Sequence, residues 1–302
     1  MKRVLFLLLI GIVLSSGLWA GGKAEGTQKG GGEATASEGV NIEVFSAAEG
    51  AQKQANDGKL HVGIVVSPLP PRAYFEDADP SKPLRGYEVD IITEIARRLD
   101  KDVVFYAVAW PTLFTGLLAD KWDMTASNIF IKKEREDMMD FAEPYLDADV
   151  ACLAKKETKI DTLEDLKGKV LGCVTGSGPE LWLRDNMAKY GPYELRTYEG
   201  HQDSFLDVET GRLDGAFTDL VAVDWYVREH DTMKRAVTLG LAYRVGFAFR
   251  PGDPLVPEVT KALQDMKREK FIMNIYYKYY NVYPPENSAA NIIFEKGYFP
   301  ES

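Results

Sequence analysis

The chain is poor in the residues that build metal centres and redox sites: its 302 residues include two cysteines and three histidines. Cys152 and Cys173 permit one disulfide at most, and the histidines lie far apart in the sequence, without the spacing of metal ligands. This inventory excludes zinc fingers, iron–sulfur clusters and disulfide-rich scaffolds. We therefore expect no metal and no cofactor.

The sequence motifs of several large enzyme classes are missing as well. No GxGxxG segment follows a predicted strand, and the patterns GxxxxGK[ST], GxSxG and HExxH do not occur. The usual signals of dinucleotide enzymes, P-loop NTPases, α/β-hydrolases and zinc proteases are thus lacking. A cysteine nucleophile paired with a histidine is also disfavoured, because both cysteines lie within apolar strand patterns, which are typical of buried structural thiols or of one disulfide.

What the chain has in excess is negative charge. Its formal charge is −10, and removal of a leader that contains Lys2 and Arg3 would make it −12, which argues against nucleic acid as a partner. Hydrophobic residues make up 45% of the chain and charged residues 27%. This composition is that of a globular protein, and it excludes intrinsic disorder, collagen and a protein with several membrane spans. The length suffices for two lobes.

Residues 1–22 have the pattern of a secretory signal peptide. Two positive charges precede an apolar run over residues 4–14, and small residues follow around Trp19. The run is shorter than the roughly 20 residues needed to span a bilayer. Cleavage after Ala20 would place the bulky Leu18 at the third position before the cut, so an uncleaved N-terminal anchor is the alternative. No cysteine for lipid attachment lies near this junction, and we expect an exported, soluble protein.

Residues 23–57 predict a flexible linker. The segment is rich in glycine and in small or charged residues, and it buries too little apolar surface to offset its ordering entropy. The short apolar stretch 40–45 does not change this prediction. We expect the folded body to begin near Lys59.

The folded body alternates strand and helix patterns. Strands are predicted over residues 59–66, 103–108, 123–127, 169–174, 194–198 and 214–218, and helices over 87–100, 111–119, 179–189, 202–211 and 220–229. A strand over 243–250 and one long helical tract over 254–280 follow. Repeated strand–helix units require a mainly parallel sheet flanked by helices, and two such blocks predict an α/β protein with two lobes.

Two charged residues follow predicted strands, where the crevice of an α/β sheet opens. Arg135 lies within a charge run that is commonly a solvated helix face, but its planar guanidinium would suit a carboxylate bidentately. Asp219 directly precedes a predicted helix and is either an N-cap or a counter-charge for a ligand ammonium. Position alone leaves both alternatives open for each residue.

Other residues near the same strand ends could form a pocket. A Gly-Ser-Gly loop opens a predicted helix, so Ser177 and Gly178 could offer backbone N–H groups to an anion, although many such loops are only turns. Trp110, Tyr74 and Phe130 could form flat apolar walls for a ligand side chain, although each is by itself more commonly a core residue.

Short segments in collinear order between residues 58 and 281 form a combined signal that is far more specific than any one of them. They are GKLHVG (58–63), LRGYEVD (84–90), AW (109–110), KKER (132–135), MDFAEPY (139–145), TLEDLKG (162–168), VTGSG (174–178), GRLDGAFTD (211–219) and GFAFRPGD (246–253). In this order the chain resembles the family 3 bacterial extracellular solute-binding proteins, the amino-acid-binding components of ABC importers.

The resemblance implies the two-lobed periplasmic binding protein fold, type II. Each lobe is then a mainly parallel sheet flanked by helices, and a two-strand hinge joins the lobes so that they close on the ligand. On this pattern residues 58–149 and 244–302 form the first lobe, with the C-terminal tail, and residues 150–243 form the second.

The resemblance also implies roles for individual residues. In the family, an arginine at the position of Arg135 binds the ligand α-carboxylate, and an aspartate at the position of Asp219 accepts the α-ammonium. Asn128 would supply a polar contact, and the loop at Ser177 and Gly178 would offer N–H groups to the carboxylate.

The chain departs from the family pattern at three places. The region of Pro68 and Leu69 replaces an aromatic residue, Phe130 replaces a small Ser or Thr, and Gly178 replaces a hydroxyl residue. Phe130 suggests a more apolar pocket wall. Arg72 would favour an acidic side chain or a second carboxylate if it pointed inward, and an exposed position in its loop is the alternative.

The implied function is binding without catalysis: capture of an amino acid or a related small zwitterion in the periplasm and its delivery to an ABC permease in the inner membrane, by a protein that we expect to be monomeric. Two alternatives remain. The same fold resembles periplasmic cyclohexadienyl dehydratases, which act on prephenate or arogenate, and Glu180 is the candidate acid, although a first-turn helix glutamate is the plainer account. The other alternative is a ligand-sensing module read by a receptor.

Overall fold

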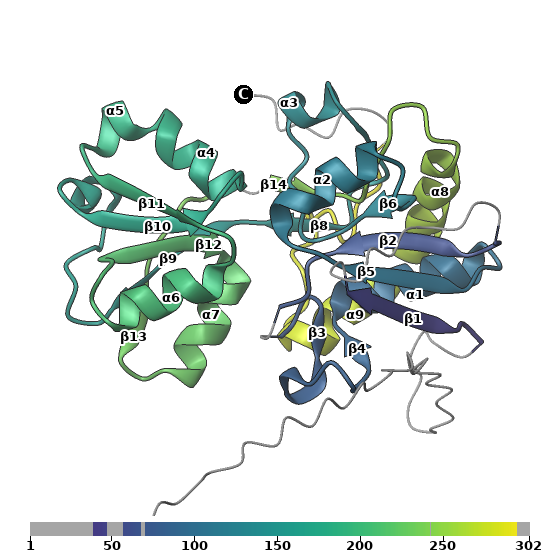
Figure 1. Cartoon of the computed structure of the whole chain (residues 1–302), viewed down its shortest axis with the longest axis horizontal. Coiled ribbons are helices and arrows are strands. Elements are labelled where there is room, and N and C mark those ends of the chain that lie inside the picture. The colour runs from purple at the N-terminus through teal and green to yellow at the C-terminus, as the bar shows by residue number, and fades with distance from the viewer. Residues whose placement is uncertain (1–38, 47–56, 68–69, 242, 295–302) are drawn as a thin grey trace, which may run out of the picture. The chain divides into compact units, whose positions relative to one another are not determined.

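The computed structural model describes residues 39–46, 57–67, 70–241 and 243–294. The predicted signal peptide and most of the predicted linker lie outside these residues. Two separate sheets, each flanked by helices, form two lobes (Figure 1). Within the described part of the chain, no helix is long and apolar enough to cross a membrane.

The first lobe is built on a six-stranded sheet. Its strands are, in spatial order, β1 (Ile42–Ser46), β5 (Val103–Ala107), β2 (Leu60–Ile64), β6 (Met124–Thr125), β15 (Ala248–Phe249) and β7 (Asp140–Phe141). Neighbours from β1 to β6 are parallel, and β15 is antiparallel to both β6 and β7.

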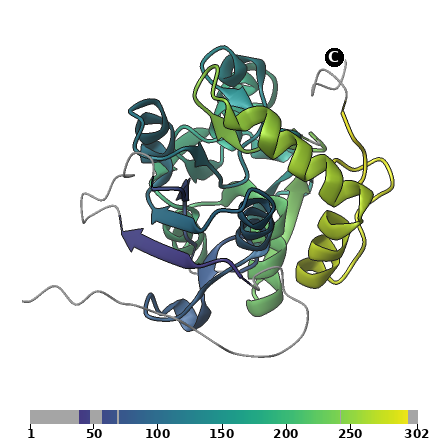
Figure 2. The same ribbon diagram turned by 90° about the vertical axis from the view of Figure 1, so that its right-hand side faces the viewer.

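Helices cover both faces of this sheet. Val103 and Phe105 of β5 belong to the core that holds α1 (Tyr87–Arg98), α8 (Leu255–Arg268) and α9 (Phe271–Tyr280). Val104 and Tyr106 belong to the core of α2 (Trp110–Leu118). Since side chains alternate along a strand, β5 is buried on both sides. Helices α8 and α9 are the green and yellow helices in Figure 2.

Strand β1 corrects the prediction of a flexible linker over residues 23–57, which is wrong at residues 42–46. This strand pairs in parallel with β5 along its full length. Asn41 anchors its start, because its backbone N–H and its side-chain amide both donate to the Asp102 carboxylate at 2.9–3.1 Å. Pairing with a distant strand supplies the hydrogen bonds that a five-residue stretch lacks by itself, so the folded body begins before Lys59.

The second lobe is built on a five-stranded mixed sheet. Its order is β11 (Glu194–Tyr198), β10 (Val170–Val174), β12 (Gly215–Asp219), β9 (Val150–Lys155) and β13 (Met233–Thr238). Strand β10 is parallel to β11 and β12, whereas β9 is antiparallel to β12 and β13. Helices α6 (His201–Glu209) and α7 (Leu220–Glu229) pack on one face, and α4 (Gly178–Asp185) with the short α5 (Met187–Tyr190) packs on the other.

The two cysteines lie in this sheet without pairing. Cys152 is on β9 and Cys173 is on β10, and strand β12 runs between them. Both thiols are buried and free, and burial raises the pKa of Cys173 to about 12. Of the two alternatives that the sequence left open, the structure supports unpaired structural thiols.

The chain crosses between the lobes twice, from β8 (Leu146–Ala148) into β9 and from β13 to β14 (Tyr243–Val245). Strands β8 and β14 pair in antiparallel register. Asp149, directly after β8, connects the two crossings: its carboxylate accepts the backbone N–H of Val150 at 2.7 Å and those of Gly240 and Leu241 at 3.1 Å. One side chain thus bonds both crossing segments.

Three predicted elements are divided in the structure. The helical tract predicted over 254–280 is interrupted at Lys270, whose φ of 60° is left-handed and cannot continue a right-handed helix. The strand predicted over 243–250 forms β14 and β15, and the helix predicted over 179–189 forms α4 and α5.

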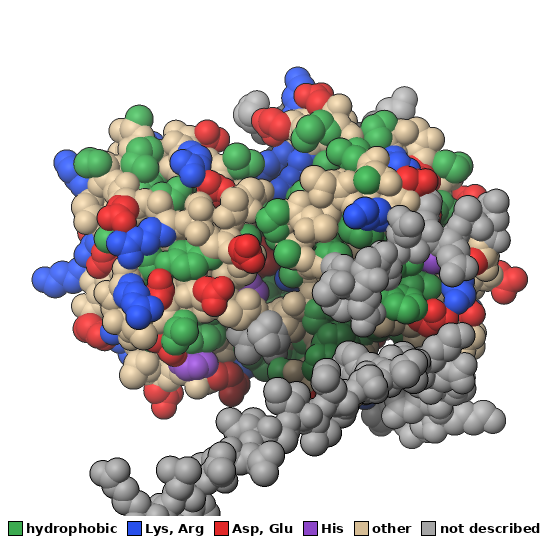
Figure 3. Space-filling view, viewed as in Figure 1, with side chains coloured by type: hydrophobic (Ala, Val, Ile, Leu, Met, Phe, Trp, Pro, Cys, Tyr) green, Lys and Arg blue, Asp and Glu red, His purple; other side chains and the backbone are tan. Residues whose placement is uncertain are grey.

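Charged side chains of both signs are interspersed over the face drawn in Figure 3.

A buried ion pair holds residues 292–294 against the first lobe. Lys267 of α8 pairs with Glu143, and both side chains are fully excluded from solvent. Lys267 Nζ also donates to the carbonyl oxygen of Ile292 at 2.7 Å, and the Glu143 carboxylate accepts the N–H of Phe294 at 3.0 Å. The pair therefore joins α8, the loop after β7 and the C-terminal segment.

We expect Lys267→Met to lower the free energy of unfolding by about 3–5 kcal/mol, because the Glu143 carboxylate would stay buried without its counter-charge. Urea denaturation measures this loss. The matched control is Lys261→Met, which removes an exposed ion pair with Asp265 on the same helix and should leave the urea midpoint unchanged. Equal losses in the two variants would contradict the prediction.

Candidate functional site

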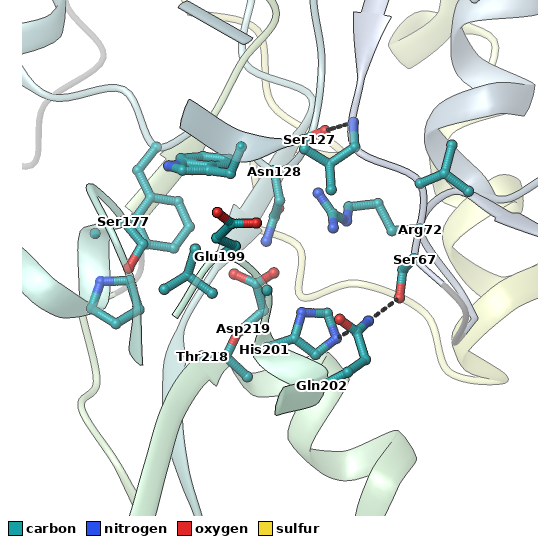
Figure 4. A pocket seen from close by; sticks show the side chains of 18 residues that line it. Ser67, Arg72, Ser127, Asn128, Ser177, Glu199, His201, Gln202, Thr218 and Asp219 are labelled. Atoms are coloured by element: carbon teal, nitrogen blue, oxygen red, sulfur yellow. Dashed lines mark hydrogen bonds between the residues drawn. The ribbon is translucent and has the colours of Figure 1, made fainter. Parts of the chain in front are cut away.

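A cavity lies between the lobes, at the carboxyl ends of strands from both sheets. The segments that follow β2, β5 and β6 line it from the first lobe, and the ends of β10 and β12 with the segments that follow β10 and β11 line it from the second. The lining comprises Val65, Val66, Ser67, Arg72, Trp110, Ser127, Asn128, Phe130, Val174, Ser177, Gly178, Pro179, Glu199, Gly200, His201, Gln202, Thr218 and Asp219 (Figure 4). In open α/β sheets, ligands bind in this position.

The cavity contains about 610 Å³ of empty space, part of which opens to solvent. A second, smaller cavity adjoins it, and the two share Ser67, Arg72, Asn128, His201 and Asp219. These five polar residues therefore lie where the two cavities meet. Among the described residues, no group of three or more His, Cys, Asp or Glu side chains is arranged to hold a metal ion.

Six of the eight residues predicted for the site line the larger cavity, namely Asp219, Asn128, Phe130, Trp110, Ser177 and Gly178. The structure does not bring Arg135 and Tyr74 to it. Tyr74 lies in β3 (Tyr74–Phe75), which pairs with β4 (Leu84–Arg85) in a small two-stranded sheet. In this structure Tyr74 is not among the residues that line the cavity.

Arg135 lies in the short helix α3 (Lys133–Glu136) and is buried. Its Nη1 donates to the carbonyl oxygen of Phe130 at 2.9 Å, and its guanidinium carbon lies 5.6 Å and 5.3 Å from the ring centroids of Trp110 and Phe114. Among the described residues it forms no ion pair, and burial lowers its pKa to about 10. Its contacts Trp110 and Phe130 line the cavity, whereas Arg135 itself does not.

Arg72 is the arginine that faces the cavity (Figure 4), so the alternative of an exposed loop position is wrong. Its backbone is held by the start of α1: the N–H of Tyr87 donates to Pro71 O at 2.9 Å, and the N–H of Glu88 donates to Arg72 O at 3.3 Å. Burial lowers the pKa of Arg72, but the charges of Glu88 and Asp219 outweigh it, so its pKa lies above the ordinary value. Sequence reasoning could not assign the direction of this side chain, which the loop geometry sets.

Asp219 occupies the N-cap position of α7, but its side chain makes no capping hydrogen bond. Its carboxylate instead faces Asn128 in the cavity (Figure 4). Burial raises the pKa of Asp219, and the Arg72 charge and a hydrogen bond from the Asn128 side chain oppose that rise. Asn128 Oδ1 is buried and has no hydrogen-bond partner among the described residues.

Phe130 and Gly178 meet across the two lobes. A Cβ atom on Gly178 would lie 2.6 Å from Phe130 Cδ2, so only glycine leaves room for this ring. Phe130 also stacks on Tyr243, with ring centroids 4.9 Å apart. Ser177, the neighbour of Gly178, is the N-cap of α4, and its Oγ accepts the N–H of Glu180 at 3.4 Å.

Sequence reasoning missed the contribution of the start of α6. His201 and Gln202 line the cavity, and Gln202 Nε2 donates to Ser67 Oγ across the lobes at 3.2 Å (Figure 4). Burial, and next the charge of Arg72, lower the pKa of His201 to about 3, so the imidazole is neutral at physiological pH. These residues carry no sequence motif, and their position after β11 is the one signal that could have indicated them.

Comparison with known proteins gives the family and the fold. The family model of the bacterial extracellular solute-binding proteins, family 3, matches residues 60–282. The L-cystine-binding protein TcyJ of Escherichia coli (strain K12) is 29% identical over 249 residues, which cover 80% of this chain and 90% of that protein. The resemblance predicted from the sequence is therefore confirmed.

Solved structures agree with the two-lobed fold. An ancestral arginine-binding protein bound to arginine is similar with a TM-score of 0.68 at 28% identity, covering 74% of this chain and 98% of that one. The ancestral amino acid-binding protein AncCDT-1, described as a precursor of cyclohexadienyl dehydratase, is similar with a TM-score of 0.66 at 26% identity, covering 74% and 95%.

We expect Gly178→Ala to lower the free energy of unfolding, because the added methyl group would overlap with Phe130. Overpacking of this kind costs about 1–3 kcal/mol. In a double-mutant cycle followed by urea denaturation, the same substitution in a Phe130→Ala background should cost nothing. An equal loss in both backgrounds would show that Phe130 is not the side chain that excludes a Cβ atom here.

We expect the stability of the protein to fall as pH drops from about 6.5 toward 3, in part through His201. In this window the unfolded chain binds a proton at His201 that the folded protein does not, since burial and the Arg72 charge lower the folded-state pKa to about 3. The thermal midpoint of His201→Gln should therefore decline less steeply between pH 6.5 and 4, with a constant offset from wild type above pH 7. Parallel profiles over the whole range would contradict this prediction.

Proposed function

Since the chain belongs to the bacterial extracellular solute-binding proteins, family 3, we propose that it captures an amino acid or a related small zwitterion between its lobes and delivers it to an ABC permease in the inner membrane. The observation that carries this proposal is the pair of opposite charges in the cavity. Arg72 and Asp219 both line it, yet among the described residues they form no ion pair with each other. A zwitterion supplies a counter-charge to each.

The ligand ammonium binds at Asp219 and Asn128. The Asp219 carboxylate makes no capping bond to α7, and the buried Asn128 Oδ1 has no donor among the described residues. An ammonium group carries three N–H donors and one positive charge, so it satisfies both acceptors at once. In a water-poor site such charge-assisted hydrogen bonds are stronger than neutral ones.

Similar proteins support an amino acid as the ligand class. The relative from Escherichia coli is an L-cystine-binding protein, and the similar ancestral structure is bound to arginine. Two arginines are then candidates for the ligand carboxylate: Arg135, from the resemblance of its sequence position, and Arg72, from its place in the cavity.

The protein binds its ligand without changing it. The candidate acid for a dehydratase-like reaction, Glu180, is engaged elsewhere: its Oε2 accepts the N–H of Gly176 at 2.6 Å, and its Oε1 pairs with Arg184 at 2.6 Å. It is not among the residues that line the cavity. Turnover of prephenate or arogenate by the purified protein, followed by absorbance, would overturn this part of the proposal.

The site of action is the periplasm. Residues 1–22 act as a secretory signal that is cleaved on export, and no cysteine is available near the junction for lipid attachment. The mature protein works as a monomer that meets its permease as the partner.

We expect the exported protein to bind at least one of the twenty amino acids or L-cystine. A ligand at 100 times its Kd stabilises the folded state by about 2.7 kcal/mol, which a thermal-shift screen detects. Asp219→Asn should then weaken binding by about 2–5 kcal/mol in titration calorimetry, because the ligand ammonium would lose its counter-charge.

The matched control is Asp224→Asn on the same helix, where the exposed carboxylate pairs with Arg235 at 2.8 Å; its Kd should equal that of wild type. If Asp219→Asn binds within threefold of wild type, the ammonium lies elsewhere. If no amino acid shifts the thermal midpoint, the proposed function is wrong.

A further inference from the structure

We infer that Arg72, and not Arg135, binds the ligand carboxylate, and that the ligand is an α-amino acid whose apolar or aromatic side chain lies against Phe130 and Trp110. The inference rests on the proposed function and adds to it an orientation and a substrate class. The head group then lies at the end of the cavity near Arg72 and Asp219, and the side chain extends toward α4.

Arg135 is buried and does not line the cavity, but it contacts two residues that do, Phe130 and Trp110. Arg135 Nη1 donates a hydrogen bond to the backbone carbonyl oxygen of Phe130. The indole of Trp110 lies over the Arg135 guanidinium. The Phe130 ring also covers Gly178, where a Cβ atom would come within 2.6 Å of it. A carboxylate that bound Arg135 would have to compete with the Phe130 carbonyl and the Trp110 ring for the guanidinium, beside a Phe130 ring that packs on Gly178 and Tyr243.

Arg72, in contrast, presents its guanidinium to the cavity. In Figure 4 the side chain points from its loop toward Asn128 and the cavity interior. Among the described residues, no hydrogen bond or ion pair engages the guanidinium. A guanidinium has five N–H donors in a planar fork that fits a carboxylate bidentately.

The acid whose charge acts most strongly on Arg72 is Glu88. Its Oε2 is buried and has no hydrogen-bond partner among the described residues, and its Oε1 is engaged within the first lobe. Glu88 Oε1 accepts the backbone N–H groups of Ser127 at 3.2 Å and Asn128 at 2.7 Å, and the hydroxyl of Tyr145. It balances the charge of Arg72 at a distance without using the donors of Arg72. The protein thus keeps a cation in the cavity and leaves its hydrogen bonds for a ligand.

The backbone geometry holds Arg72 in place. The N–H of Ser67 donates to Ala73 O at 2.8 Å and closes the loop, and the carbonyl oxygens of Pro71 and Arg72 accept the first N–H groups of α1. Gly86 has a φ of 137° and leaves no space for a Cβ atom against the Arg72 carbonyl. The backbone from which the Arg72 side chain extends is therefore fixed before a ligand binds, which lowers the entropic cost of binding.

The opposite end of the cavity is apolar. Phe130, Trp110, Val174 and Pro179 form its walls. Glu199 also lines the cavity but is exposed to solvent, so an ion pair between it and a cationic ligand side chain would add little affinity. An apolar or aromatic side chain gains most from this end, because burial of its apolar surface against these walls is favourable.

The test is a double-mutant cycle in which one change is made in the protein and the other is removal of the ligand carboxylate. Binding to the exported protein is measured by titration calorimetry. L-leucine, L-methionine and L-phenylalanine are the primary probes, and L-arginine and L-cystine are the comparison probes. L-leucine is matched with 3-methylbutylamine and L-phenylalanine with phenethylamine, which lack only the carboxylate. The protein variants are Arg72→Gln, Arg135→Gln and, as a control outside the cavity, Arg85→Gln, whose exposed side chain pairs with Glu76.

We expect L-leucine or L-phenylalanine to bind more tightly than L-arginine and L-cystine, and Arg72→Gln to weaken that binding at least 30-fold. Replacement of the amino acid by the amine that lacks its carboxylate should weaken binding to wild type, Arg135→Gln and Arg85→Gln to a similar extent. In Arg72→Gln the same replacement should change Kd less than threefold. Circular dichroism and thermal midpoints identify any variant that fails to fold. The cycle with Arg72→Gln by itself remains decisive if Arg135→Gln does not fold.

Three results would overturn the inference. A full loss on removal of the carboxylate in Arg72→Gln, with none in Arg135→Gln, would assign the carboxylate to Arg135 and leave the proposed function intact. Tighter binding of L-arginine or L-cystine would reject the apolar substrate class and also leave that function intact. Binding of no amino acid at all would reject the proposed function, and the inference with it.

Discussion

The Asp149 carboxylate is the interaction on which the arrangement of the two lobes depends. It accepts N–H groups from the start of β9 and from Gly240 and Leu241 in the returning segment, so the two crossings are bonded to each other beside the paired strands β8 and β14. The carboxyl ends of strands from both sheets then face one space. The ends of these strands, the loops that follow them and the first residues of the next helices line the cavity, although none of these segments would form a binding site by itself.

Within that space the protein keeps opposite charges apart. Arg72 is fixed from the first lobe by the backbone of α1, and Asp219 is fixed from the second at the start of α7. Each influences the pKa of the other, but no ion pair joins them among the described residues. Fixed charges that cannot neutralise each other are a preorganised receptor for a molecule that carries both signs, because little reorganisation accompanies binding.

The sequence alone predicts the strand–helix alternation, the two lobes and most of the cavity lining, because residues that follow strand ends meet at one edge of a sheet. It does not predict β1, whose five residues gain their order from pairing with β5, nor the break at Lys270, a residue type that ordinarily favours helices. The placement of the two arginines could not be predicted for another reason. Which of them faces the cavity depends on ring packing around Arg135 and on loop closure at Arg72, and neither is visible in local sequence.

The contact between Phe130 and Gly178 bears on how the lobes separate. The aromatic ring meets bare backbone and not an interlocking side chain, and the neighbouring side-chain bridge between the lobes is the neutral hydrogen bond from Gln202 to Ser67. Separation of the lobes therefore requires no rotamer change at the contact between Phe130 and Gly178, and it breaks no ion pair there. With an interface of this kind, the rate of ligand release depends mainly on the ligand itself, because its contacts with both lobes keep them closed.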